Sequence, residues 1–259
     1  MTILEKITTD KRLQVARDRR AVPIAELERR PGFVRERLSL AGSIRRPDRS
    51  GIIAEYKRHS PSKGYINRLA TVEQVTDAYA RHGASGISVL TDEPYFKGTA
   101  QDLIAARTTV GIPLLRKEFV VEDYQIVEAA ALGADAILLI AECLTAPEVR
   151  DFARLARQLD LEVLMEIHSE AQLDKWTPDI GLIGVNNRDL KTFEVSVENS
   201  VRLFPQLPTE AVRISESGIS EPATIRRLRE VGFEGFLIGE QFMKSDDPGR
   251  AFASFIEDV

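Results

Sequence analysis

Residues Ile52–Gly64 read IIAEYKRHSPSKG. This stretch begins as a buried strand, yet Glu55 and Lys57 stand two residues apart, and side chains two apart in a strand point to the same face. A Ser-Pro-Ser-Lys-Gly loop follows at once. An acid and a base that share one face at the end of an apolar strand indicate the edge of a functional site.

Seven further short apolar runs follow along the chain. They are GISVLTD from Gly86, IPLLRKEF from Ile112, DAILLIAE from Asp135, LEVLMEIH from Leu161, GLIGVNNRDL from Gly181, AVRISESGI from Ala211 and GFLIGEQFM from Gly235. Helix-like stretches separate the runs, and Gly83, Gly133 and Gly232 stand where helix C-caps belong. Eight alternating strand and helix units predict a parallel (β/α)8 TIM barrel, with an open doubly wound sheet as the alternative.

The first 48 residues do not show this alternation. The segment from Ile3 to Arg30 is polar with a rough helical period, a second helix is expected to begin near Pro23, and RRPDRSG at 45–51 is turn material. We therefore expect a single domain over residues 1–259, in which an N-terminal helical extension at about 1–48 precedes the barrel at about 49–259.

The composition is globular, with 43% hydrophobic and 29% charged residues. The net charge of -5 argues against nucleic acid as a partner. The single cysteine, Cys143, and three widely separated histidines give neither a disulfide framework nor a metal-ligand spacing, so we expect no metal and no cofactor. A charged N-terminus and the lack of a long apolar run predict a cytoplasmic protein that does not bind membranes.

Polar residues gather at the C-terminal ends of several runs, where a barrel carries its active site. They are Glu55, Lys57, Lys117, Glu166, His168, Asn186, Arg188 and Glu216. Each charge alone is compatible with a structural ion pair, but two lysines and three glutamates in one ring favour catalysis. Burial is expected to lower the pKa of Lys117 and to raise those of Glu166 and Glu216 toward the range useful for proton transfer. A lone strand-end histidine such as His168 is more typical of a hydrogen-bonded structural residue, and Cys143 of a small buried hydrophobe.

The seventh and eighth runs end in SESGIS and LIGEQF, which place Gly218 and Gly239 beside strand ends. Backbone N–H groups of these two loops often bind phosphate in barrels. Ser60 adds a hydroxyl, and NNRD at 186–189 adds two amides and a guanidinium. The residues alone thus predict a barrel enzyme that acts on a phosphorylated small molecule by Lys and Glu proton transfer.

Six motifs in this order resemble the indole-3-glycerol phosphate synthase family of tryptophan biosynthesis, essentially end to end. They are IIAEYKRHSPSKG, LRKEF, MEIH, GVNNRDLKTF, SESGI and LIGEQFMK. The resemblance implies a lyase that converts 1-(2-carboxyphenylamino)-1-deoxyribulose 5-phosphate into indole-3-glycerol phosphate, with loss of CO2 and water. Glu118 stands where the family usually has Asp, and it is expected to point away from Lys117.

The resemblance also implies roles for individual residues. The implied catalytic residues are Glu55, Lys57, Lys117, Glu166, Asn186, Glu216 and Ser217, and the implied substrate and phosphate ligands are Ser60, Phe96, Arg188, Gly218, Gly239 and Glu240. Lys117 would donate the proton for ring closure, Lys57 would hold the substrate carboxylate, and Phe96 would lie beside the aromatic ring. For the dehydration, Glu166, Glu55 and Lys57 all remain open. We expect a monomer or weak homodimer, and a loop at 59–64 that closes over the substrate.

Two rival functions remain at this level. A Schiff-base aldolase on the same fold would use Lys57 or Lys117 as its nucleophile. A binder of phosphorylated ligands would keep the anion site without turnover, although it has no need of five charged groups placed for proton transfer.

Overall fold

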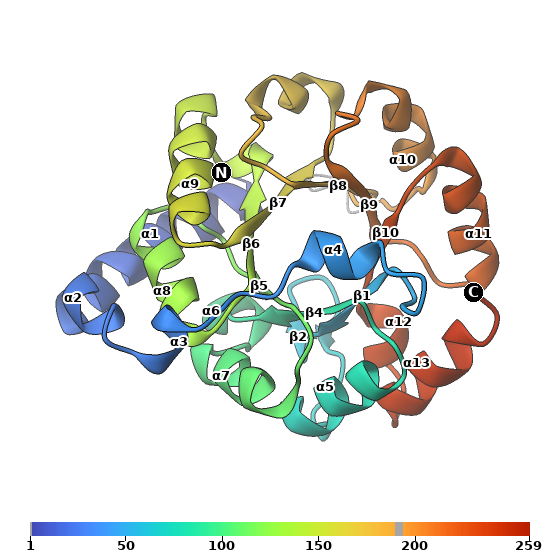
Figure 1. Cartoon of the computed structure of the whole chain (residues 1–259), viewed down its shortest axis with the longest axis horizontal. Coiled ribbons are helices and arrows are strands. Elements are labelled where there is room, and N and C mark those ends of the chain that lie inside the picture. Colours follow the sequence, from blue (N-terminus) through green and yellow to red (C-terminus); the bar gives the residue numbers. More distant parts are fainter. Residues whose placement is uncertain (1, 190–193) are drawn as a thin grey trace.

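The computed structural model describes residues 2–189 and 194–259. Eight parallel strands close into a barrel in the order β1-β10-β9-β8-β7-β6-β5-β4, and helices surround it (Figure 1). The strands are β1 (Ile52–Tyr56), β4 (Gly86–Leu90), β5 (Leu114–Lys117), β6 (Ala136–Ile140), β7 (Glu162–Ile167), β8 (Leu182–Asn186), β9 (Val212–Glu216) and β10 (Gly235–Ile238). Each falls within one of the eight predicted runs, so the predicted barrel is confirmed and the open sheet is wrong.

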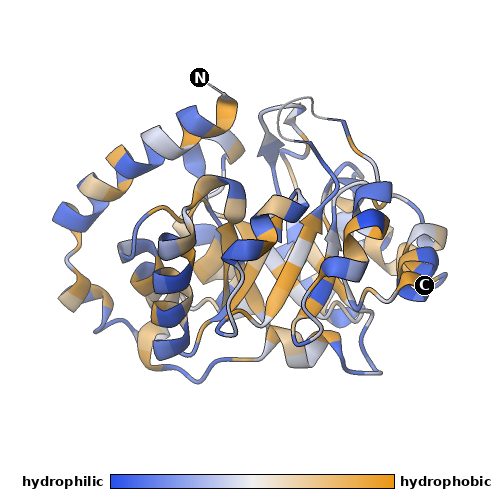
Figure 2. Ribbon diagram, turned by 90° about the horizontal axis from the view of Figure 1, so that it is seen from above, coloured by the Kyte–Doolittle hydropathy of each residue, from blue (hydrophilic) through white to orange (hydrophobic). Residues whose placement is uncertain are grey.

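The strands are nearly continuous apolar runs because both of their faces are buried. One face packs against the helices, and the other fills the barrel with a cluster that includes Ile53, Leu115, Leu164 and Ile214. Figure 2 shows this distribution, with hydrophobic residues concentrated in the central strands and hydrophilic ones on the outer helices.

The helices begin and end where local sequence signals favour it. They are α1 (Ile3–Ala21), α2 (Ile24–Leu27), α3 (Pro31–Val34), α4 (Leu40–Ile44), α5 (Val72–Arg81), α6 (Glu93–Phe96), α7 (Ala100–Thr109), α8 (Tyr124–Leu132), α9 (Ala146–Gln158), α10 (Glu198–Leu203), α11 (Pro222–Val231), α12 (Glu240–Met243) and α13 (Pro248–Ile256), with 3-10 turns η1 (Ala141–Cys143), η2 (Glu170–Lys175) and η3 (Phe204–Gln206). Thr2, Thr99 and Thr145 form capping boxes. Gly133 and Gly232 cap α8 and α11 in the left-handed conformation, as predicted.

Helix α4 closes the barrel at the N-terminal ends of the strands, and its position was not predicted from the sequence. Its Leu40 and Ile44 belong to the cluster inside the barrel. The carboxylate of Glu162, at the start of β7, accepts hydrogen bonds from the backbone N–H groups of Leu40 and Ala41 at 2.6 and 2.9 Å. In Figure 1, α4 lies across the barrel mouth that faces the viewer. Any ligand site must therefore use the opposite mouth.

Helix α1 lies at that opposite mouth. Lys11 on α1 is only 2% exposed, and its Nζ lies 2.9 Å from Asp92 Oδ2 and 3.0 Å from Glu118 Oε1. Asp92 follows β4 and Glu118 follows β5, so this double ion pair fixes the extension to the carboxyl ends of two strands. A short hairpin of β2 (His59–Ser60) and β3 (Gly64–Tyr65) follows β1 at the same mouth.

Among the described residues, no helix combines the length and apolar character that crossing a membrane requires.

Candidate active site

A cavity of about 180 Å³ opens at the carboxyl ends of the strands. All the site residues predicted from the sequence line it except Gly218 and Gly239. The cavity has a charged floor, one apolar wall and a cationic rim.

Lys117 at the end of β5 lies at the centre of the charged floor. Its Nζ is 2.8 Å from Glu166 Oε2 on β7 and 3.0 Å from Glu216 Oε2 on β9. Burial lowers the pKa of Lys117, but the nearby carboxylates of Glu166, Glu216 and Glu55 outweigh it, so the pKa is raised above that of an ordinary lysine. The predicted lowering of this pKa is therefore wrong, because the prediction counted burial and not the partners that the barrel brings together.

Glu166 has a second set of partners on its other oxygen. Asn186 Nδ2 donates to Oε1 at 3.0 Å, and His168 Nε2 lies 3.5 Å from the same atom. Burial raises the pKa of Glu166, but Lys117, His168 and Asn186 together lower it to about 2. The predicted rise is wrong for this residue, which is ionised at neutral pH.

Glu216 behaves as predicted. Burial raises its pKa to about 7 against the opposing charge of Lys117, and the neighbouring charges of Glu166 and Glu55 add to the rise. Its Oε1 is buried and has no hydrogen-bond partner in the described part of the chain. Two different acids therefore contact the ammonium group of Lys117. Glu166 is ionised, and Glu216 takes up a proton near neutral pH.

Glu55 on β1 and Lys57, just after the end of that strand, form an ion pair. Lys57 Nζ lies 2.7 Å from Glu55 Oε1, and Ser88 Oγ on β4 donates to Glu55 Oε2 at 3.3 Å. Glu55 is buried and Lys57 is half-buried, so the ammonium lies on the side of the cavity.

The apolar wall contains Phe96, whose ring centroid is 6.0 Å from that of Phe119. Further wall residues come from β6, which contributes Leu138 and Ile140, and from α1, which contributes Ile3, Leu4 and Ile7. None of these five residues was predicted to belong to the site. The period-two pattern of β6 was a usable signal for Leu138 and Ile140, but no local signal places α1 over the barrel.

The rim carries the predicted phosphate ligands. Ser217 and Gly218 follow β9 with positive φ values of 68° and 75°, and Ser60 lies in the hairpin. The carboxylate of Glu240 lies 3.8 Å from both Arg188 Nη2 and Lys63 Nζ, so its side chain balances these cations.

Gly239 packs closely against the side chain of Glu55. A Cβ built on Gly239 would lie 2.7 Å from Glu55 Oε1 and 2.8 Å from Glu55 Cβ.

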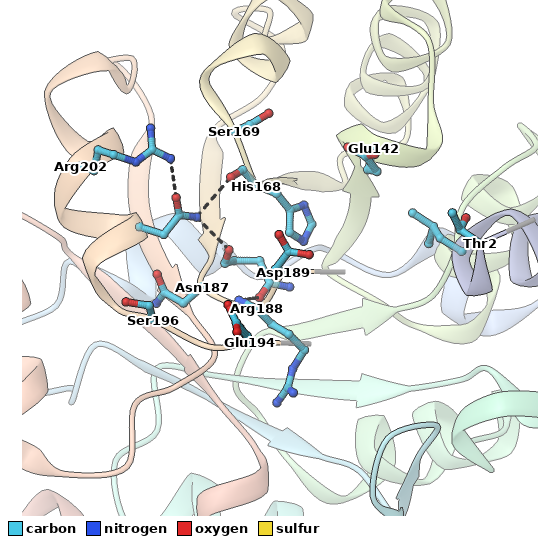
Figure 3. Close-up of a pocket in the computed structure, with 13 residues that line it drawn as sticks. Thr2, Glu142, His168, Ser169, Asn187, Arg188, Asp189, Glu194, Ser196 and Arg202 are labelled. Carbon is cyan, nitrogen blue, oxygen red and sulfur yellow. Dashed lines mark hydrogen bonds between the residues drawn. The ribbon is translucent and has the colours of Figure 1, made fainter. Parts of the chain in front are cut away.

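A second pocket of about 420 Å³ shares Leu4, Asn186 and Arg188 with the cavity. Figure 3 shows its labelled side chains, with His168 and Arg202 on one side and Arg188 toward the barrel. Asn199 Nδ2 donates to the backbone oxygens of His168 and Asn186, both at 3.2 Å. Neither ring nitrogen of His168 makes a hydrogen bond to a described residue, so the predicted hydrogen bond is not seen, and the ring instead faces Glu166, with Nε2 3.5 Å from Oε1.

Glu118, Cys143 and the end of the GVNNRDLKTF motif were also singled out in the sequence. Glu118 points away from Lys117, as expected, and binds Lys11 and Thr91 Oγ1 instead. Cys143 is half-buried against the core, and burial raises the pKa of its thiol to about 12. The last four residues of the motif GVNNRDLKTF, 190–193, lie outside the described residues.

Comparison with solved structures supports the fold. The tryptophan synthase alpha subunit of Legionella pneumophila str. Paris aligns with a TM-score of 0.59 at 12% identity, over 80% of this chain and 90% of that one. A thiamine phosphate pyrophosphorylase from Pyrococcus furiosus also aligns with a TM-score of 0.59, at 14% identity over 80% of this chain and 93% of that one. At such identities the likeness concerns the barrel alone.

Sequence relatives are far more similar. An indole-3-glycerol phosphate synthase of Bacteroides thetaiotaomicron is 45% identical over 257 residues, which cover 99% of this chain and 98% of the relative. Another, of Laribacter hongkongensis, is 45% identical over 256 residues and 97% of each chain. The family model described as indole-3-glycerol phosphate synthase matches residues 4–255. The chain belongs to the indole-3-glycerol phosphate synthase family.

Proposed function

We propose that the charged floor performs the proton transfers of the family's reaction, with Lys117 as the proton donor for ring closure. The observation that carries this proposal is the placement of Lys117 between two carboxylates at the bottom of the cavity. An ammonium group has three N–H donors. Glu166 and Glu216 take two of them, which leaves the third for a substrate oxygen.

Ring closure joins the aromatic carbon that bears the carboxylate to the carbonyl carbon of the ribulose. The π electrons of the carbonyl group move onto its oxygen, which then takes a proton. The alkoxide that forms is a much stronger base than an amine, so a lysine with a raised pKa still transfers its proton to it. The two carboxylates keep Lys117 charged until that moment and fix the direction of its ammonium group, whose positive charge stabilises the developing alkoxide without reorganisation.

Decarboxylation follows at the same ring carbon. The bond to the carboxylate breaks, its electron pair restores the aromatic ring, and CO2 leaves. Lys57 is suited to hold this carboxylate beforehand because its ammonium lines the cavity and is anchored by Glu55 at 2.7 Å. The apolar wall around Phe96 is suited to the aromatic ring and excludes water from it.

Dehydration then forms the indole double bond. The hydroxyl on the former carbonyl carbon leaves as water after it takes a proton, while a base removes a proton from the neighbouring CH2 carbon. We assign the base to Glu166, because Lys117, His168 and Asn186 keep its carboxylate ionised and able to accept a proton. We assign the acid to the Lys57 and Glu55 pair, and the sugar hydroxyls to Asn186. Ser217, Gly218, Gly239, Arg188 and Ser60 would bind the phosphate.

The assay mixes the purified protein with 1-(2-carboxyphenylamino)-1-deoxyribulose 5-phosphate and follows the rise of indole fluorescence. We expect turnover without added metal or nucleotide. A Lys117→Met variant, purified in the same way, controls for contaminating host enzyme. If the protein shows no turnover but binds the substrate, the binder is the better account. If borohydride traps a covalent adduct in the presence of substrate, the Schiff-base aldolase is the better account.

Several expectations about the whole protein remain proposals. We propose a single domain that acts in the cytoplasm on a small phosphorylated substrate, as a monomer or weak homodimer, without nucleic acid or membrane partners. We also propose that the loop at 59–64 closes over the substrate. Hydrogen exchange in that loop is expected to slow when product binds, and unchanged exchange would contradict closure.

A further inference from the structure

Gly184 lies in the middle of β8, in the inward-facing row between Leu182 and Asn186. A Cβ built on Gly184 would lie far inside 3.0 Å of Glu216 Oε1, a distance that real Cβ atoms essentially never reach. It would also lie 3.0 Å from Glu216 Cδ and 3.2 Å from Leu164 Cδ1. The carboxyl group of Glu216 therefore occupies the space that a side chain at position 184 would fill.

The register of the barrel explains this close approach. Gly184 pairs with Ile214 on β9 and with Glu166 on β7. Glu216, two residues beyond Ile214, reaches back across β8 to Lys117 Nζ, which its Oε2 contacts at 3.0 Å. Glu166 contacts the same ammonium from β7. The two carboxylates approach Lys117 from either side of β8, and they do so over the one inward-facing position of that strand that has no side chain.

The conformation of Gly184 is compatible with other residues. Its φ lies outside the left-handed region, and it sits in regular parallel pairing. Backbone freedom is therefore not what favours glycine here. The atom that obstructs a Cβ is the far end of the Glu216 side chain, which can rotate, and no backbone atom is among the three nearest. An alanine would thus displace the Glu216 carboxylate while the barrel keeps its strand pairing.

We propose that Gly184 is a positioning residue for the reaction: its missing side chain provides the space from which Glu216 holds Lys117. The inference rests on the proposed role of the Lys117 floor. It adds that the space at position 184 determines where the Glu216 carboxylate can lie. A larger residue at 184 moves the Glu216 carboxylate away from Lys117 and turns the proton donor out of line with the substrate oxygen.

The first test compares Gly184→Ala with Gly181→Ala. Gly181 precedes the same strand, and a Cβ built on it meets no atom within 4 Å. We expect Gly184→Ala to lower kcat by about 10²-fold, as displacement of a catalytic group by about 1 Å does, with KM within about threefold. Gly181→Ala is expected to keep kcat within about twofold. A wild-type kcat in Gly184→Ala would overturn the proposal.

A double-mutant cycle with Glu216→Ala separates positioning from a general effect on the barrel. Once Glu216 is shortened, the methyl group at 184 has nothing to displace, so Gly184→Ala is expected to change kcat less than about twofold in that background. An equal loss in both backgrounds would overturn the proposal. So would wild-type turnover in Glu216→Ala, because Gly184 would then have no functional group to position.

A crystal structure of Gly184→Ala gives a readout that does not depend on activity. We expect the barrel unchanged and the Glu216 to Lys117 contact broken. A contact kept near 3.0 Å would overturn the inference even if the protein proves to be a binder. If the wild type shows no turnover while the contact breaks in the variant, the proposed function fails and the geometric inference stands.

Discussion

Lys11 and Lys117 each lie between two carboxylates, but of these two lysines only Lys117 lines the cavity. Lys117 contacts Glu166 and Glu216 at 2.8 and 3.0 Å, and Lys11 contacts Asp92 and Glu118 at 2.9 and 3.0 Å. In both, burial lowers the pKa and the carboxylates outweigh it, so both pKa values are raised. Neither the distances nor the direction of the pKa shift distinguishes the two clusters.

The third N–H group does distinguish them. Lys11 Nζ donates to Gln14 Oε1 at 3.0 Å on its own helix, so each of its donors has a protein partner. Among the residues that the structure describes, Lys117 Nζ has acceptors for two of its three N–H groups, and Lys117 lines the cavity. A fully partnered ammonium holds two elements together, whereas one with a spare donor can bind and protonate a substrate. Substitutions at Lys117, Lys11, Glu216 and Arg12 test this difference.

The largest effect is expected for Lys117→Met, which removes the donor and keeps the apolar stem. Loss of a general acid is expected to lower kcat by at least about 10²-fold. Substrate binding is expected to persist because Lys57, Arg188 and the apolar wall are unchanged. Steady-state fluorescence assays, at a temperature where circular dichroism shows the variant folded, measure kcat and KM. A kcat near that of the wild type would remove Lys117 from the mechanism.

Lys11→Met is expected to affect stability more than chemistry. Removing one partner of a buried ion pair costs about 3–5 kcal/mol, because the carboxylates of Asp92 and Glu118 stay buried without their cation. Urea unfolding measures this loss, and kcat of the folded fraction is expected to stay within about tenfold of the wild type. If Lys11→Met instead loses turnover as completely as Lys117→Met without losing stability, the distinction between the two lysines collapses.

Glu216→Gln tests the charged floor around Lys117 through the pH dependence of stability. The pKa of Glu216 is raised from its ordinary value of 4.5 to about 7, so the folded state holds this proton more tightly than the unfolded state. Its contribution to stability is fully present below about pH 4.5 and is lost as the pH rises through 7. The glutamine variant cannot titrate, so its free energy of unfolding relative to the wild type is expected to rise across this window by up to about 1.4 kcal/mol per pH unit. Urea unfolding at pH 5, 6, 7 and 8 measures this, and a constant difference would contradict the raised pKa.

The smallest effect is expected for Arg12→Ala, one residue along α1 from Lys11. Arg12 lies on the exposed side of the helix, with its guanidinium 3.4 Å from Glu122 and from Glu148. Exposed ion pairs contribute about 1 kcal/mol or less to stability, so urea unfolding is expected to show a small loss and kcat to stay unchanged. A loss as large as that of Lys11→Met would mean that exposure does not separate these contacts.

The two lysines also show what a sequence reveals. Lys117 could be predicted because it continues the period-two pattern of β5, and strand ends in a barrel converge on one site. Lys11 lies in a polar stretch where nothing local indicates that its partners, Asp92 and Glu118, come from two distant strands. The pKa directions of Lys117 and Glu166 were wrong for the same reason, since they depend on neighbours that only the closed barrel supplies. The eight strands needed only local patterns, and each lies inside a predicted run, although several runs extend past the C-terminal end of the strand.

The short elements escaped prediction because they depend on tertiary contacts. The local sequence signals for a helix at α4 are weak. Helix α4 is held by Glu162 and by apolar contacts inside the barrel. The close approach of Gly184 and Glu216 likewise requires the register of β8 against β9.

The most direct test of the account follows CO2 release and indole formation together in Lys117→Met. The substrate carries a ¹⁴C label in its carboxylate, and rapid quenching samples both products. Because ring closure precedes decarboxylation, a variant that lacks the ring-closure donor is expected to release CO2 as slowly as it forms indole. Release of CO2 at the wild-type rate with slow indole formation would contradict the account, because Lys117 would then serve the dehydration and not the ring closure.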